Sequence, residues 1–438
     1  MKRIIPLALI LSVGLSVMAC SGKGNYDAGL SANYRLSGDA ADSQCVTEDS
    51  VITIGQKDSG KYIESYELVF DAPEGKDISI AYRTHIQDAG WCQWSPSETE
   101  MAYEQYYGID TIQIMFYGKD AFMYDVYYRV AVVGEDWQDW VSNGALAGAP
   151  EEHRVIEAIE IRIEINEDYK SSKWTLTEFT DDSGNQAMFY TLLNNDDGTL
   201  VVVDGGWDAN TEQVRSVIGL FGGTVDHWFI THYDEDHASV FNAIYNDPDG
   251  IEIGQVYASP MDYDYYLGFA VDRPWETPWV YETFLAQTEG DDRIHYLCRG
   301  DEFEIDGLQI DVFNAYDQMV VDTGNPDVAN NTSLVFKITG DDDSILFCAD
   351  IRYDLGMQIL DMYGDAMDAE YVQAAHHGNN TVPYEFYEQV GAQVVLFDGP
   401  AWLTQTENYP VRDLIAQCRD NGITTYEFET APNSFGFN

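Results

Sequence analysis

The apolar residues of this chain follow three patterns in succession. Residues 4–17 form a mostly apolar run behind two basic residues, Lys2 and Arg3. Between residues 27 and 166, apolar and polar positions mix in short stretches, which is typical of half-buried strands. Beyond residue 174, apolar runs end abruptly in charged residues, as buried strands do where they reach a loop. The pattern predicts a leader, a β-rich domain and an α/β domain.

The β-rich part contains an internal repeat. Three similar stretches start 46 and 47 residues apart, at residues 63–68, 109–114 and 156–161. A second landmark keeps this spacing, because Trp91 and Trp94 recur as Trp137 and Trp140. Three units of this size need one another to close a core, and paired tryptophans could form a sugar-binding platform or fill that core. We therefore expect an all-β repeat domain over residues 21–166.

The part from residue 174 to 438 predicts a second domain. Residues 188–193 and 199–203 have the pattern of two strands joined by a turn, and residues 211–221 that of a helix ended by glycines. Residues 225–230 are a mostly apolar run typical of a buried strand. Strands and helices thus alternate here, as in an α/β domain.

Four potential metal ligands follow the run 225–230 within six positions: His232, Asp234, Asp236 and His237. A strand end followed by a tight turn can direct such clustered side chains to one point. Imidazoles and carboxylates together supply the nitrogen and oxygen donors that Zn²⁺, Mn²⁺ or Fe ions take. The alternative is a solvated polar turn or a helix N-cap.

Two later segments also have a strand pattern that leads into potential metal ligands. Residues 344–350 have the pattern of a buried strand that ends at Asp350, and residues 371–380 include a strand-to-loop junction with His376 and His377. Five of the eight histidines of the chain lie in or next to these three segments. This concentration favours a metal site over three unrelated loops.

The pattern His-x-Asp-x-Asp-His over residues 232–237 resembles the signature of the metallo-β-lactamase superfamily. It is most similar to the hydrolase domain of the DNA-uptake competence proteins (ComEC-type), which have Asp at the third position. The His-His-Gly at 376–378 and the Asn-x-x-Ser at 330–333 are similar to the same family. The resemblance implies that residues 174–438 form an αββα sandwich.

The resemblance also implies a ligand set and roles. Two divalent ions, Zn²⁺ or Mn²⁺, would be held by His232, Asp234, Asp236, His237, Asp350 and His376, with Asp350 bridging them. Asp234 or Asp236 would take part in catalysis by orienting an attacking hydroxide and accepting a proton. His377 would stabilise negative charge on the substrate. Asp204 would orient a ligand histidine from behind.

The sequence also departs from the superfamily pattern. The glycine pair that usually follows Asp-His is Ala238-Ser239 here. A separate middle histidine of the superfamily pattern has no clear equivalent, and His295 is a weak candidate for it. Whether one ion or two bind therefore stays open.

Two further resemblances concern the cell surface. Residues 80–94 and 137–163 resemble the tryptophan-containing ChW repeats of Gram-positive surface proteins, which implies binding to cell wall or glycan. The run 4–17 with Val17-Met18-Ala19-Cys20 resembles a bacterial lipoprotein signal over residues 1–20, the alternative being an ordinary cleaved signal. It implies that Cys20 is lipidated and anchors the protein at the outer face of the cell membrane, with the lipid as the only membrane contact.

Charge narrows the range of partners. The chain has 76 acidic and 22 basic residues, a formal charge of −54 spread along its length. Proteins that bind nucleic acid usually show a basic stripe, and none is visible, so nucleic acid is a disfavoured partner. We expect a surface-tethered, metal-dependent hydrolase of phosphodiester bonds, acting on a small phosphodiester or a cell-envelope substrate. The alternative is a degenerate metal-binding fold that serves as a cell-wall or glycan adhesin.

Overall fold

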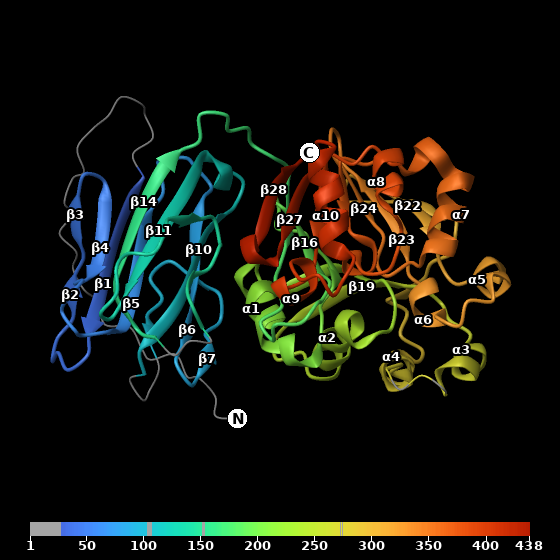
Figure 1. Cartoon of the computed structure of the whole chain (residues 1–438), viewed down its shortest axis with the longest axis horizontal. Helices are drawn as coiled ribbons and strands as arrows, with labels where there is room; N and C mark the ends of the chain where they lie inside the picture. Colours follow the sequence, from blue (N-terminus) through green and yellow to red (C-terminus); the bar gives the residue numbers. More distant parts are fainter. Residues whose placement is uncertain (1–27, 103–106, 151–153, 272, 274) are drawn as a thin grey trace.

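The computed structural model of the chain describes residues 28–102, 107–150, 154–271, 273 and 275–438. The expected signal over residues 1–20, with Cys20, lies outside these residues. Figure 1 shows two bodies side by side, with strands β1 to β14 in one and the later elements in the other. Among the described residues, no helix is long and apolar enough to cross a membrane.

The first body is a repeat domain of three antiparallel sheets. The first sheet contains β2 (Ser43–Gln44), β1 (Gly29–Leu36), β5 (Ile63–Asp71) and β9 (Met101–Ala102). The second contains β13 (Ala147–Gly148), β10 (Ile109–Tyr117), β6 (Ser79–Ile86), β7 (Gly90–Trp91) and β8 (Ser95–Pro96). The third contains β12 (Val141–Ser142), β11 (Tyr124–Val132), β14 (Ile156–Ile165), β4 (Val51–Gly55) and β3 (Val46–Glu48).

The three predicted repeats are strands, one in each sheet. They form the first parts of β5, β10 and β14, and their first residues Ile63, Ile109 and Ile156 are all 0% exposed. All three side chains belong to the same hydrophobic core. The expectation that three units close one core is therefore confirmed.

The second sheet of the repeat domain differs from the expected half-buried pattern. In β10, every residue from Ile109 to Phe116 is buried. One face packs in the repeat core, while Ala81, Met115 and Trp94 pack in a core of the second body. The expectation of a half-buried strand is wrong for β10 because its sheet lies between the two bodies. Trp94 consequently fills the interface between domains and not the repeat core.

The second body contains two seven-stranded sheets. The first is ordered β20 (Ile294–Tyr296), β19 (Glu252–Ala258), β18 (Thr224–Ile230), β17 (Leu200–Asp204), β16 (Phe189–Asn194), β15 (Trp174–Glu178) and β28 (Asn433–Phe437). The second is ordered β21 (Glu302–Ile305), β22 (Leu308–Asn314), β23 (Val335–Thr339), β24 (Ser344–Phe347), β25 (Tyr371–Gln373), β26 (Val394–Phe397) and β27 (Thr424–Glu427). Strands β17 to β20 pair in parallel, as do β24 to β27.

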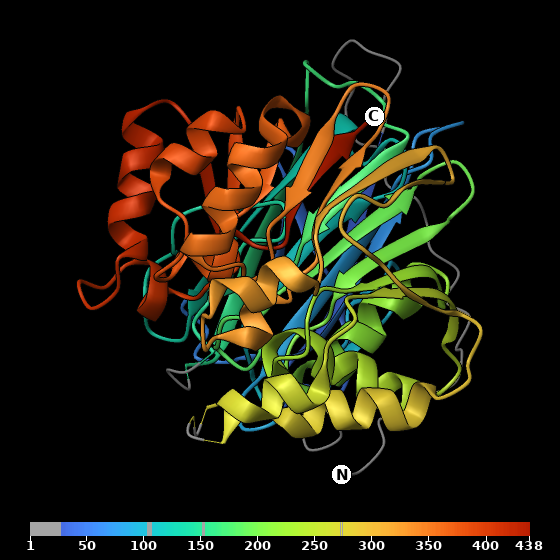
Figure 2. The same cartoon turned by 90° about the vertical axis from the view of Figure 1, so that its right-hand side faces the viewer.

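The two sheets pack face to face and helices cover their outer faces (Figure 2). Between the sheets the Phe336 ring stacks on Phe229 and Phe347, with centroids 4.7 and 5.2 Å apart. Helices α1 (Thr211–Leu220), α2 (Glu235–Asn246) and α4 (Pro278–Thr288) pack on the first sheet. Helices α7 (Tyr353–Tyr363), α8 (Tyr384–Gln389) and α10 (Val411–Asp420) pack on the second. The remaining helices are α3 (Tyr263–Ala270), α5 (Gln318–Thr323), α6 (Val328–Asn331) and α9 (Ala401–Thr404).

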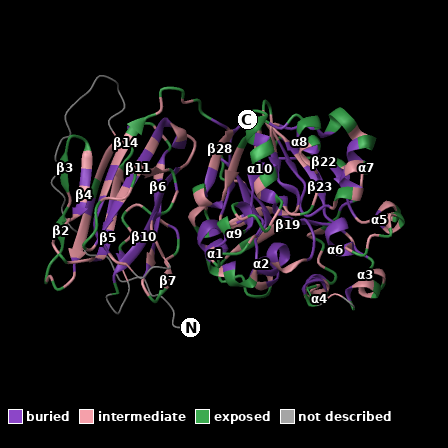
Figure 3. Ribbon diagram, in the orientation of Figure 1, coloured by how far each residue is buried: buried purple, intermediate pink, exposed green. Residues whose placement is uncertain are grey.

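Burial follows these layers. Figure 3 shows the strands of the second body largely buried, while α7 and α10 expose one side to solvent. A helix that packs one apolar stripe on a sheet leaves the opposite side in water, and this gives a four-layer domain. The predicted αββα sandwich behind an all-β domain is confirmed.

Candidate metal centre

The residues predicted to bind metal lie at the carboxyl ends of parallel strands in both sheets. In the first sheet, β17 ends at Asp204 and β18 is followed directly by Thr231 and His232. In the second sheet, Asp350 follows β24, and His376 and His377 follow β25. Parallel strands place their carboxyl ends at one edge of a sheet, so each sheet presents its polar residues at one edge.

The backbone is strained at these strand ends. The φ angles of Asp204, Ala349, His376 and His377 are 54°, 43°, 49° and 54°. This left-handed region costs a residue with a side chain about 1 kcal/mol or more, and such strain clusters at functional sites. The turns direct side chains from two sheets towards one another.

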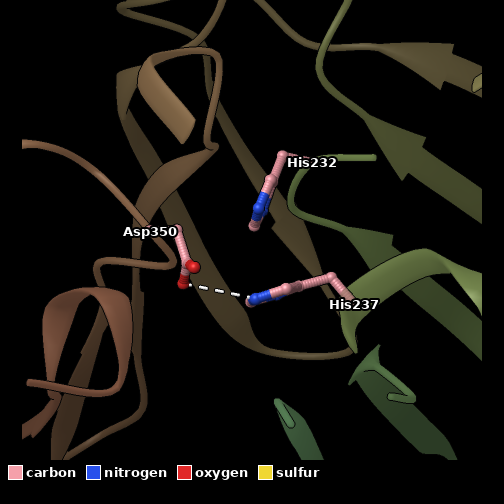
Figure 4. Close-up of side chains that lie close together, drawn as sticks. All are labelled: His232, His237 and Asp350. Atoms are coloured by element: carbon pink, nitrogen blue, oxygen red, sulfur yellow. Dashed lines mark ion pairs between the residues drawn. The ribbon is translucent and has the colours of Figure 1, made fainter. Parts of the chain in front are cut away.

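Five buried side chains form a cluster in which ligand atoms converge. His232, His237 and Asp350 make one group and Asp236, His237 and His377 another, with ligand atoms within 4.8 Å of one another in each group. We call these five residues the metal cluster. His237 Nε2 lies 3.2 Å from Asp350 Oδ1, and His377 Nε2 lies 3.4 Å from Asp236 Oδ2. Figure 4 shows His232, His237 and Asp350 pointing towards one another from separate segments.

Most of the converging atoms have no hydrogen-bond partner among the described residues. The buried atoms without one include Nε2 of His232, His237 and His377 and Oδ1 of Asp350. Leaving such an atom unsatisfied costs about 1–3 kcal/mol, so four in one place are suited to hold a shared ligand. Imidazole nitrogens and carboxylate oxygens are donors that Zn²⁺ and Mn²⁺ accept, so the residues fit a divalent metal.

Two further aspartates contact the Nδ1 atoms of His237 and His377. Asp204 Oδ2 lies 2.7 Å from His237 Nδ1, and Asp204 Oδ1 accepts a hydrogen bond from Thr231 N at 2.8 Å. This is the role expected for Asp204. His377 Nδ1 donates to the backbone carbonyl oxygen of Asp398 at 3.1 Å. The same Nδ1 lies 3.5 Å from the side-chain Oδ1 of Asp398. In both histidines Nδ1 is engaged, so Nε2 faces the cluster.

Asp398 is a residue of this site that the sequence did not predict. This residue directly follows the buried strand β26, just as Asp350 follows the apolar end of β24. A buried strand that ends in an aspartate is the signal that could have identified it. Both carboxylates are at most 2% exposed.

The cluster holds mutually stabilised charges. Burial by itself would lower the pKa of His237 and of His377, but Asp350 raises both well above the usual range. Burial would raise the pKa of Asp350, yet the adjacent histidines hold it well below its usual value. A cation bound here would take the place of protons on the histidines, so its binding would release protons.

Asp234 and His376, two predicted ligands, lie at the margin of the cluster. Asp234 Oδ2 is 3.5 Å from His232 Nε2, and although Asp234 is the N-cap residue of α2, its side chain makes no cap hydrogen bond. Its carboxylate is therefore available to a ligand. His376 Nε2 is 3.6 Å from Asp350 Oδ2.

The structure favours exchanging the roles expected for the two adjacent histidines. His376 Nδ1 donates to the carbonyl oxygen of Asn379, and Arg352 Nη1 lies 3.4 Å from its Nε2, so both ring nitrogens have partners. His377 Nε2 instead faces two carboxylates of the cluster, 3.4 Å from Asp236 Oδ2 and 3.6 Å from Asp350 Oδ2. His377, and not His376, thus belongs to the groups of converging ligand atoms in the described residues.

His295 does not complete the cluster. It lies on β20, and its Nε2 is 2.7 Å from Gln255 Oε1, while its ring stacks on Tyr257. Neither group of converging ligand atoms in the described residues includes it. The structure therefore does not place His295 in the position of the middle histidine of the superfamily pattern.

Each of the two bodies contains a segment that matches a known family model. Residues 187–371 match the family model described as the metallo-beta-lactamase superfamily, and residues 132–164 match the model described as ChW, clostridial hydrophobic W. No curated protein matched the chain.

Several solved structures are similar at low identity. A mutant of the CmlA β-hydroxylase is 13% identical, with a TM-score of 0.35, over 59% of this chain and 53% of its own. A Cronobacter sakazakii metallo-β-lactamase with a HARLDQ motif is 12% identical, with a TM-score of 0.30, over 57% and 87%. A subclass B3 metallo-β-lactamase from a soil metagenome library is 13% identical, with a TM-score of 0.29, over 48% and 78%. The chain thus spans about half the length of the first of these structures.

Two observations agree on the fold of the second domain. They are the order of strands in its two sheets and the match over residues 187–371. The second domain has the metallo-β-lactamase fold, and it follows an all-β domain with a ChW match.

Proposed function

We propose that the protein is a metal-dependent hydrolase of phosphodiester bonds. The observation that carries the proposal is the set of buried, unpartnered ligand atoms in the metal cluster. His232, Asp236, His237, Asp350 and His377 would hold the metal, with Asp234 at the rim. Zn²⁺ and Mn²⁺ both suit this mixture of imidazole and carboxylate.

The side chains around the cluster have distinct tasks. Bound divalent ions would polarise the scissile bond and make a water molecule nucleophilic near neutral pH. Asp204 and Asp398 hold His237 and His377 so that each Nε2 points inward. Asp234 Oδ1 is buried and unpartnered, so it can accept the proton released by the attacking water.

Arg352 supports an anionic substrate. Its Nη1 lies 2.9 Å from His376 Nδ1, at the edge of the metal cluster, and its Nε lies 3.3 Å from Asp327 Oδ2. Its side chain is 21% exposed, so solvent reaches it. A guanidinium beside a metal site, in a chain with a charge of −54, is suited to hold a phosphate oxygen.

The cellular part of the proposal rests on the sequence. Cys20 would carry a lipid that anchors the enzyme at the outer face of the cell membrane, and the repeat domain would contact cell wall or glycan. The charge of −54 opposes binding of a long polyanion. We therefore propose a small phosphodiester or a cell-envelope phosphodiester as substrate, in preference to DNA.

Hydrolysis of bis(4-nitrophenyl) phosphate tests the activity. We expect turnover with Zn²⁺ or Mn²⁺, and loss of turnover in Asp236→Asn because a ligand charge is removed. Asp361→Asn is the matched control, since Asp361 is exposed on α7. Single-stranded DNA and a lactone would be tested beside it. A wild-type protein that cleaves only the lactone, or an Asp236→Asn variant with full activity, would overturn the proposal.

A further inference from the structure

The second repeat unit contains a tryptophan–arginine cluster in which Arg83 and Trp94 are buried, at the contact between the two domains. The Arg83 guanidinium, on β6, lies over the rings of Trp91 and Trp94, 4.2 and 4.9 Å from their centroids. Arg83 is only 1% exposed. A guanidinium removed from water in this way needs a full set of partners.

The third repeat unit contains an equivalent cluster. Arg129, 46 residues after Arg83, lies over Trp137 and Trp140, 4.9 and 4.6 Å from their centroids. Arg162 also lies over Trp140, at 4.4 Å. The two clusters therefore provide an internal comparison, with the same residue types at the same spacing.

The two clusters differ in the carboxylate that pairs with the arginine. Arg129 pairs with Glu160, on the neighbouring strand β14 of its own sheet. Arg83 instead reaches the other domain, where Nη1 and Nη2 donate to Asp182 Oδ2 and Oδ1 at 2.6 and 2.8 Å. This two-bond geometry is the strongest that arginine and a carboxylate form. The second unit has thus become a contact between domains.

Asp182 lies in the loop 179–188, which joins β15 to β16. Helix α1 and the turn before it bind the first half of this loop, at Asp181 and Asp182. Asp182 N donates to Gln213 Oε1 at 3.1 Å, and Asn210 Nδ2 donates to Asp181 Oδ1 at 2.6 Å. The loop is therefore fixed between α1 and the repeat domain.

The far part of the same loop contacts the metal cluster. Gln186 Nε2 donates to Asp236 Oδ2 at 3.3 Å, and Met188 N donates to the carbonyl oxygen of Asp236 at 3.2 Å. Trp207 Nε1 donates to the carbonyl oxygen of Gln186 at 2.7 Å. Both the side chain and the backbone of Asp236 are therefore held by this loop.

We propose that Arg83 of the repeat domain is a positioning residue for the metal centre. Through Asp182 it fixes the 179–188 loop, and through Gln186 the loop orients the Asp236 carboxylate. The inference rests on the proposed function in one respect, namely that Asp236 binds metal. It makes the repeat domain a structural part of the metal centre as well as a surface-binding module.

Metal affinity in the full-length chain tests this inference. The dissociation constant for Zn²⁺ would be measured by competition with a chelator in the wild type and in Arg83→Met, Asp182→Asn and Gln186→Leu. Loss of a residue that orients a ligand typically weakens metal binding about 10–100-fold, and we expect about tenfold for each variant. Arg129→Met is the matched control, because its partner Glu160 lies in the same domain, and its affinity should stay within about twofold.

Two further readouts separate positioning from a general loss of structure. The visible spectrum of the Co²⁺-loaded protein reports ligand geometry, and it should change in the same way in Asp182→Asn and Gln186→Leu. The double variant Arg83→Met/Gln186→Leu should bind metal no more weakly than Gln186→Leu alone, because both act through Asp236. If Arg83→Met fails to fold, Asp182→Asn decides, since asparagine has nearly the same size but lacks the charge and one of the two oxygens that accept from Arg83.

The possible results distinguish this inference from the proposed function. A wild-type chain that binds no Zn²⁺ or Co²⁺ would overturn both. A wild-type chain that binds metal, with Asp182→Asn and Gln186→Leu of unchanged affinity and spectrum, would overturn the positioning role alone. The positioning role would also be overturned if Arg129→Met weakened metal binding as much as Arg83→Met does. The contact between domains would then have no effect beyond that of a contact within one domain.

Discussion

Adjacent residues with the same side chain have different surroundings in this protein. His376 and His377 both have a left-handed backbone, and their ring centroids lie 6.1 Å apart. His376 contacts the Asn379 carbonyl and Arg352, whereas His377 contacts Asp236, Asp350 and Asp398. Sequence could identify the pair but not the ligand, because the choice depends on backbone angles and on an aspartate 21 positions away.

Metal content should separate the two histidines. We expect His377→Ala to lose metal, because it removes an inward-facing Nε2, and His376→Ala to keep the wild-type amount. Metal per folded chain would be measured by mass spectrometry after dialysis against a fixed free Zn²⁺ concentration. The reverse result, with His376→Ala empty and His377→Ala loaded, would restore the assignment made from sequence.

Arg352 should affect binding of the substrate more than its turnover. Arg352→Met removes a charged donor, so we expect the KM for bis(4-nitrophenyl) phosphate and the inhibition constant of inorganic phosphate to rise about tenfold. The kcat should change much less. Arg419→Met on α10, whose side chain is 54% exposed, is the control. Equal KM values in the two variants would remove Arg352 from the substrate site.

At the scale of elements, the buried Glu178 joins three strands of the first sheet. From β15, its Oε1 lies within hydrogen-bond distance of Tyr190 Oη on β16 at 3.2 Å, and its Oε2 accepts from Asn433 Nδ2 on β28 at 2.7 Å. Burial, with a further contribution from Asp398, raises its pKa from 4.5 to about 8. Glu178 is therefore neutral in the native protein at neutral pH.

This shift predicts a pH dependence of stability. The unfolded chain loses the Glu178 proton near 4.5 and the native protein near 8, so the free energy of unfolding should fall as pH rises between these values. Glu178→Gln should flatten that slope and unfold at higher urea concentration at pH 8, since an amide can donate to Tyr190 and accept from Asn433. The exposed Glu212→Gln is the control. Identical slopes in the wild type and Glu178→Gln would contradict the raised pKa.

Several elements were predictable because their patterns are local. The expected strands at 188–193, 199–203 and 225–230 correspond to β16, β17 and β18, and the expected helix at 211–221 to α1. The double burial of β10 and the contact of Arg83 with Asp182 were not predictable. Both depend on how two domains dock, and the paired residues are 99 positions apart.

At the scale of the whole molecule, the metal centre depends on long-range contacts. The metal cluster takes its residues from both sheets, so neither half of the sandwich contains the whole cluster. The last strand, β28, returns to pair with β15, the first strand of the same domain. The repeat domain contacts the loop beside Asp236. A change in any of these regions can therefore affect the same site.

Metal stoichiometry in the full-length chain tests the central claim most directly. Side chains from separate strand ends should bind about one to two equivalents of Zn²⁺ or Mn²⁺ per wild-type chain. Asp350→Ala, shown to be folded by circular dichroism, should lose most of this metal because Asp350 faces His237, His376 and His377. A folded wild-type chain that retains no stoichiometric metal, or an Asp350→Ala variant that retains it all, would contradict the account.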